Sequence, residues 1–104
     1  MRLSYILTIF LDVGTTLVAR SCHELQGIAS ITTKEKCEET ARALGLPDTT
    51  AVQFRDLRYP PFCYYKTVDE GPNRRKGLKF NTAADSSMPC HTLRQCLCQD
   101  DLSK

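Results

Sequence analysis

The sequence predicts an α+β fold in which one helix packs on a small antiparallel sheet and disulfides stabilise the domain. Three observations lead to this class. One segment carries both start and stop signals of a helix, several short downstream segments carry strand signals, and six cysteines occur among 104 residues. An even number of cysteines in so short a chain is typical of a secreted protein, because a small core alone is only marginally stable.

The helix is expected at about residues 33–44. Thr32 followed three residues later by Glu35 has the pattern of a capping box, which satisfies backbone N–H groups at a helix start. Gly45 can adopt the left-handed conformation that ends a helix, and Pro47 prevents its continuation. Three residues recur at helical spacing and are expected to face the sheet: Cys37, Ala41 and Leu44.

Short β-prone segments follow the helix. They alternate apolar and polar residues or are rich in aromatic and β-branched residues, as strands are. The expected strands are residues 51–54, 62–68, 78–80 and 94–99. Residues 69–77 form a polar turn between the second and third strands, which indicates a hairpin with a long tip, and residues 81–90 are expected to be a loop. The sheet's half of the core is expected to come from Val52, Phe54, Leu78 and Phe80.

The N-terminal residues have the pattern of a secretory signal peptide. Arg2 precedes an apolar segment, residues 3–11, and small residues follow it. Cleavage after Ala19 and cleavage after Ser21 both match, and the second is preferred. A membrane anchor is disfavoured because Asp12 ends an apolar segment that is too short for a hydrocarbon core of about 30 Å. The expected parts are a signal peptide at 1–21, a single cysteine-rich domain at 22–99 and a flexible tail at 100–104.

The charge of the mature chain excludes two classes of partner. Removing Arg2, Arg20 and Asp12 from the 14 basic and 12 acidic residues of the whole chain leaves 12 basic and 11 acidic residues. This near balance argues against nucleic acid and against an anionic membrane surface, both of which need a basic excess. The mature protein is expected to be secreted, extracellular and monomeric. Membrane insertion is not expected, because no segment after residue 21 approaches the length needed to span a membrane.

Metal binding and catalysis are both disfavoured. A zinc site would draw on three sequence pairs: Cys22 with His23, Cys90 with His91, and Cys96 with Cys98. These thiols would have to stay reduced, which the oxidising secretory route opposes. One polar loop holds the candidate catalytic residues, Asp85, Ser86, Ser87 and His91, but no nucleophile signature surrounds either serine. We therefore expect no catalytic residues, no metal, no cofactor and no enzyme activity.

Several motifs taken together resemble an apple/PAN-like extracellular domain. They are the helix TKEKCEETARALGL, the strand AVQF, and the segments FCYYK, LKFN and RQCLC, and they cover about residues 27–98. The resemblance implies a secreted recognition or structural module that binds a protein or a glycan and has no catalytic residues. It also implies a disulfide between Cys37 of the helix and Cys63 of the central strand. Further cysteines of the apple pattern are missing, since Ala41 stands four residues after Cys37.

The other two expected disulfides follow from chain position. Cys22 opens the mature chain and Cys98 closes the domain, so a bond between them would tie the two ends. Cys90 and Cys96 then remain, with five residues between them. Because side chains two apart in a strand share a face, the sequence also allows Cys96 and Cys98 to exchange partners.

Arg74, Arg75 and Lys76 form the one local charge cluster, at the expected hairpin tip. The cluster suits contact with an acidic partner, a channel vestibule or a processing enzyme that cleaves at basic sites, but a solvated hairpin tip is the preferred explanation of the charges. We expect the contact there, with residues 59–62 as the alternative. The expected function is a secreted, non-catalytic, disulfide-rich interaction protein that binds an extracellular protein or glycan, with venom and defence among its settings. The alternatives are a toxin acting on an ion channel or receptor and a peptidase inhibitor.

Overall fold

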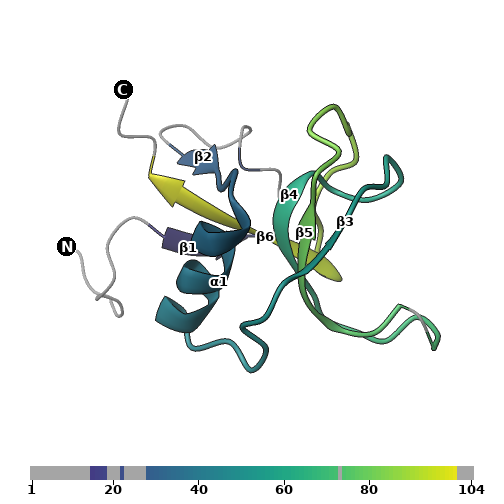
Figure 1. The fold of residues 1–104 in the computed structure, drawn as a ribbon, viewed down its shortest axis with the longest axis horizontal. Helices are drawn as coiled ribbons and strands as arrows, with labels where there is room; N and C mark the ends of the chain where they lie inside the picture. The colour runs from purple at the N-terminus through teal and green to yellow at the C-terminus, as the bar shows by residue number, and fades with distance from the viewer. Residues whose placement is uncertain (1–14, 19–21, 23–27, 73, 101–104) are drawn as a thin grey trace.

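The α+β class is confirmed by the computed structural model, which describes residues 15–18, 22, 28–72 and 74–100 (Figure 1). One helix packs on a mixed sheet. In chain order the elements are β1 (Thr15–Val18), β2 (Ile28–Ser30), α1 (Lys34–Ala43), β3 (Val52–Phe54), β4 (Phe62–Lys66), β5 (Gly77–Asn81) and β6 (Arg94–Asp100). In Figure 1 the connection between β4 and β5 extends away from α1, so the predicted long tip is present.

The sheet is organised around β6, with strand order β1-β6-β4-β5-β3. One edge of β6 pairs with β1, and its other edge pairs with β4 and, further along, with β2. One pair departs from the expected antiparallel arrangement, since β3 and β5 are parallel. The reason is topological: β4 and β5 form an antiparallel hairpin, and β3 runs opposite to β4, so β3 lies beside β5 in the same direction.

Strands β1 and β2 were not expected from the sequence. β1 lies within the segment predicted to be the signal peptide, and the predicted cleavage sites at Ala19 and Ser21 lie outside the described residues. Asp100, predicted to begin the tail, is the last residue of β6, and residues 101–104 also lie outside the described part of the chain.

Helix α1 begins one residue later than the sequence pattern suggested. Thr33, not Thr32, is the N-cap, and its Oγ1 accepts the Lys36 N–H at 3.2 Å. The expected capping box with Glu35 is therefore wrong, because the box requires the cap three residues before the acidic side chain. The C-terminal end is as predicted: Gly45 has φ +72°, and backbone N–H groups beyond the helix bond back to its last carbonyls.

The core is divided between the two faces of the sheet. The helix side holds Ile31, Cys37, Ala41, Ala51, Cys63, Leu78, Phe80 and Leu97, with Leu44 packed against it. The opposite side holds Cys22, Tyr64, Cys90, Cys96 and Cys98. The prediction of Val52 and Phe54 for the helix side is wrong. Val52 pairs with Lys79 rather than with Leu78, so it shares the opposite face and is 54% exposed, while Phe54 packs on the second cluster.

Three disulfides join these layers. Cys37–Cys63 ties α1 to β4, Cys22–Cys98 ties the start of the domain to β6, and Cys90–Cys96 closes the loop before β6. These are the three pairs expected from the sequence. Among the described residues no cysteine is free.

Candidate functional site

A cleft of about 280 Å³ opens on the sheet face away from α1. It is lined by Val52, Phe54, Asp56, Arg58, Tyr59, Tyr64, Lys66, Arg74 and Lys79. Four of these residues are basic and one is acidic, so the lining carries a net charge of +3. The cleft therefore concentrates positive charge that the whole-chain balance does not reveal.

The floor of the cleft is set by strand register. Val52 of β3 lies opposite Lys79 of β5, which lies opposite Tyr64 of β4, so the three side chains form a row across one face. Lys66 follows Tyr64 by two residues and shares that face. The alternate residues of the same strands, such as Leu78, point into the helix-side core.

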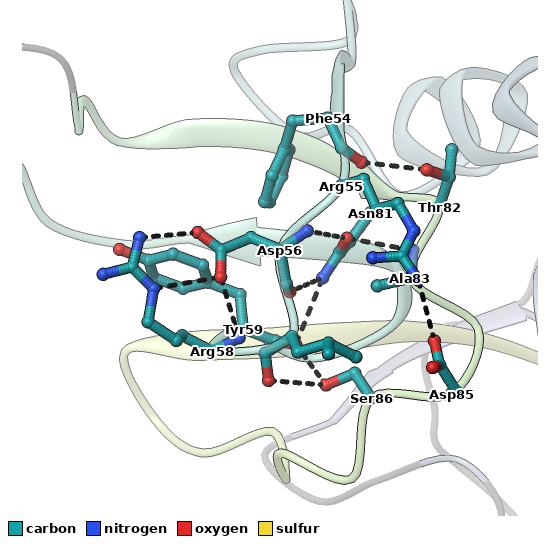
Figure 2. A network of polar contacts seen from close by, with 11 residues as sticks. Phe54, Arg55, Asp56, Arg58, Tyr59, Asn81, Thr82, Ala83, Asp85 and Ser86 are labelled. Atoms are coloured by element: carbon teal, nitrogen blue, oxygen red, sulfur yellow. Dashed lines mark hydrogen bonds and ion pairs between the residues drawn. The ribbon is translucent and has the colours of Figure 1, made fainter.

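The rim of the cleft is a loop held by one buried amide, that of Asn81 (Figure 2). Asn81 Oδ1 accepts the N–H groups of Asp56 at 3.0 Å and Ala83 at 3.1 Å. Its Nδ2 donates to the carbonyl oxygens of Asp56 at 2.8 Å, Tyr59 at 3.1 Å and Pro60 at 2.9 Å. These bonds fix the backbone from which Asp56, Arg58 and Tyr59 reach the cleft.

Ser86 anchors the same rim from the other side. Its Oγ contacts the carbonyl oxygens of Tyr59 at 2.6 Å and Leu57 at 3.3 Å (Figure 2). The rim loop is thus bonded to two separate segments, β5 and the loop after it. We expect the cleft to keep its shape without a ligand, because its supporting backbone is satisfied internally.

The acidic residue of the cleft, Asp56, is already neutralised. Arg58 donates to it through Nε at 3.0 Å, through Nη2 at 2.8 Å and through its backbone N–H at 2.8 Å. The side-chain hydrogen bond from Arg58 is the main cause that lowers the pKa of Asp56 to about 2. The pair therefore contributes little net charge to the cleft at neutral pH.

A second acidic group, Glu70, forms ion pairs with two cations at the base of the hairpin. Lys66 Nζ and Arg94 Nη2 both lie 2.7 Å from Glu70 Oε1, and Lys66 is only 3% exposed. The hydrogen bond from Lys66 is the largest cause that lowers the pKa of Glu70. One carboxylate faces two cations, so this cluster keeps an excess positive charge. The Tyr59 ring lies against both cations, with centroid distances of 5.8 Å to Lys66 and 5.0 Å to Arg94.

Lys79 and Arg74 lack an ionic partner among the described residues. Burial is the main cause that lowers the pKa of Lys79, and the charge of Lys66 lowers it further. Burial also raises the pKa of Tyr64, so its phenol stays neutral. Chemically, the cleft offers cationic and neutral donors to an anionic group.

The structure places the predicted contact residues in two groups. Arg74 lines the cleft, whereas Arg75 and Lys76 are exposed at the hairpin tip and are not part of the lining. Tyr59, from the alternative contact segment, also lines the cleft. Sequence reasoning did not identify the remaining charged members, Asp56, Arg58, Lys66 and Lys79. The strand alternation of Lys66 and Lys79 is the signal that would have placed them on one face.

The residues weighed for catalysis have other contacts. Asp85 pairs with Arg55 at 3.5 Å, Ser86 bonds backbone carbonyls, and a ring nitrogen of His91 lies 3.1 Å from Arg94. Within the described ranges, no group of three or more histidine, cysteine or acidic residues is arranged to hold a metal ion. The same part of the chain contains no helix that is long and apolar enough to span a membrane.

The fold and the cleft define a small, disulfide-stabilised α+β protein with a cationic cleft. No protein-family model matches the chain, and no curated protein or solved structure matches it.

Proposed function

We propose that the protein is a secreted, non-catalytic interaction protein that binds an extracellular protein or glycan through the cationic cleft. The observation that carries this proposal is the lining of the cleft, with four basic residues against one acidic residue that is already paired. Concave surfaces with convergent polar groups and perturbed titration are the usual location of a binding site.

Two further features support the proposal. Three disulfides are typical of proteins that fold in oxidising compartments, as a secreted protein does. The bond between α1 and β4 is the one that the apple/PAN resemblance implies, and we retain that assignment as part of the proposal. A non-catalytic role suits the cleft, because none of its lining residues is a serine, cysteine or histidine that could act as a nucleophile or general base.

The test is binding by the disulfide-intact protein, as secreted by a eukaryotic host, to arrays of extracellular proteins and glycans at low and high ionic strength. We expect binding to a subset of the array that weakens as salt rises, because the contact is ionic. Lys79→Gln should reduce this binding while the fold, checked by circular dichroism, is retained. A folded protein that binds nothing on either array, or binds equally after Lys79→Gln, contradicts the proposal.

Processing is tested separately, on protein secreted by a eukaryotic host. We expect its N-terminal residue, read by Edman degradation, to be Cys22 or Arg20. Secreted protein that retains Met1 would contradict the signal peptide.

A further inference from the structure

We infer that the ligand of the cleft is an acidic segment of a partner protein, which places one carboxylate between Arg74 and Lys79 and a neighbouring apolar side chain on Val52. This inference rests on the proposed function and deepens it by choosing protein over glycan and by naming the chemistry of the partner.

The first step is the balance of charge inside the cleft. Asp56 is held by Arg58, and Glu70 is shared by Lys66 and Arg94. Among the described residues no carboxylate forms an ion pair with Arg74 or Lys79, although Asp48 and Asp69 are near enough to raise the pKa of Lys79. Both cations are therefore available to a ligand, and a carboxylate is the protein group that forms charge-assisted hydrogen bonds with such donors. Burial and the charge of Lys66 lower the pKa of the partly buried Lys79 ammonium. A nearby anion would stabilise the charged form of Lys79.

The second step is the apolar side of the cleft. Val52 lines it and is 54% exposed, and Phe54 lies beside it in the lining. An exposed apolar residue beside two cations that have no ionic partner within the described ranges is complementary to a segment in which an acidic residue adjoins an apolar one. A uniformly polyanionic chain would leave this surface uncovered.

The third step is the position of β3 in the sheet. β3 ends the strand order and pairs with β5 alone among the described strands, so its other edge is open beside the cleft. An extended protein segment can use the backbone groups of such an edge while its side chains enter neighbouring pockets. A glycan has no equivalent of this contact.

The aromatic residues also disfavour a sugar. Arg58, Lys66 and Arg94 all contact the Tyr59 ring, at 5.9, 5.8 and 5.0 Å from its centroid. Phe54 adds an edge-to-face contact with the same ring at 5.9 Å. Tyr59 is therefore used in internal packing, and a sugar ring would have to displace one of these groups to stack on it.

The experiment selects short random peptides displayed on phage against the disulfide-intact protein secreted by a eukaryotic host, and then measures the best sequence as a synthetic peptide. We expect enriched sequences to pair Asp or Glu with an adjacent aliphatic or aromatic residue. Replacing the acidic residue of the peptide by its amide should weaken binding about tenfold, as the loss of a charge-assisted hydrogen bond does. A heparin oligosaccharide is the parallel glycan probe.

Arg74 and Arg75 provide a matched pair of variants. Both are exposed at the same hairpin tip, but only Arg74 lines the cleft. Arg74→Gln should weaken the peptide about tenfold, whereas Arg75→Gln should stay within about twofold, as expected for a surface charge. Both variants should fold, because neither side chain is buried.

Three outcomes overturn the inference. They are enrichment of peptides without acidic residues, equal losses in the two variants, and Arg74-dependent binding of the heparin oligosaccharide without peptide binding. The last outcome leaves the proposed function intact, because a glycan then occupies the cleft. If the protein binds nothing on the arrays and no peptide is enriched, both the inference and the proposed function are contradicted.

Discussion

At the scale of single residues, Asn81 shows how one buried side chain determines the shape of the candidate site. Its amide makes five hydrogen bonds, four of them to the rim loop of residues 56–60. A hydrophobic side chain of similar size could fill the space but would leave these backbone groups without partners. Buried polar groups in that state each cost about 1–3 kcal/mol.

Asn81→Ala should therefore lower the free energy of unfolding by about 3 kcal/mol or more and weaken ligand binding by loosening the rim. Asn81→Asp should be at least as harmful, because it turns a donor that faces three carbonyl oxygens into an acceptor. Gln53→Ala, at an exposed position in β3, is the control and should change stability by less than about 0.5 kcal/mol. Urea unfolding measures the stability of all three variants. An Asn81→Ala protein as stable as Gln53→Ala would contradict the role of Asn81 in holding the rim loop.

The carboxylates of the site make a prediction about acid. Hydrogen bonds from Arg58 and Lys66 lower the pKa values of Asp56 and Glu70, from ordinary values of 3.8 and 4.5. A lowered pKa in the folded state means stability that is present above the unfolded-state pKa and is lost as pH falls through the folded-state value. We expect the free energy of unfolding to fall from about pH 4.5 towards pH 2, where Asp56 titrates.

NMR titration of the carboxyl carbons tests this directly. Asp56 should titrate near 2 in the original protein and closer to its ordinary value of 3.8 in Arg58→Gln. Arg55→Gln is the control, because that arginine pairs with Asp85 instead. If Asp56 titrates at its ordinary value in the original protein, Arg58 does not stabilise the charged form of Asp56 in solution, and the prediction is wrong.

At the scale of secondary structure, the elements that the sequence predicted are those with local signals. The helix has a cap, a periodic face and a glycine stop, and β4, β5 and β6 have alternation or aromatic residues. β2 is only three residues long and depends on pairing with β6, so its own residues carry little signal. The direction and face of β3 depend on register with β5, a non-local contact that moved Val52 out of the core.

The helix start offers a test of one such boundary. Thr33 accepts the Lys36 N–H, so Thr33→Ala should reduce the free energy of unfolding by about 1 kcal/mol. Thr32→Ala is the matched control, because Thr32 is the adjacent threonine, is exposed and is not the N-cap. It should have an effect below about 0.5 kcal/mol. Equal effects, or a larger effect of Thr32→Ala in thermal unfolding, would place the cap where the sequence pattern suggested.

The candidate site was less predictable than the fold, because it is built from separate segments. Arg74 came from a visible charge cluster and Tyr59 from a proline-rich segment. Lys66 and Lys79 look like ordinary polar positions of strands until pairing brings them to one face. Asn81 has no sequence signal of its role, since a strand-end asparagine is usually a turn residue.

At the scale of the whole molecule, the disulfides are unequally distributed over the two cores. One bond, Cys37–Cys63, lies on the helix side, and the other two share the cluster around Tyr64. The residues of these two bonds are all at most 4% exposed, so removing either bond costs similar packing. What separates the two bonds is the length of chain that each one closes.

That difference predicts an order of stability. Cys22–Cys98 closes a sequence separation of 76 residues, whereas Cys90–Cys96 closes a separation of 6. Because a cross-link stabilises mainly by restricting the unfolded chain, the longer loop should contribute about 2 kcal/mol more. We expect Cys22→Ala/Cys98→Ala to unfold at lower urea than Cys90→Ala/Cys96→Ala, with the other two disulfides intact in each by mass spectrometry. The reverse order would show that native packing around the short loop, rather than restriction of the unfolded chain, dominates the contribution of these bonds.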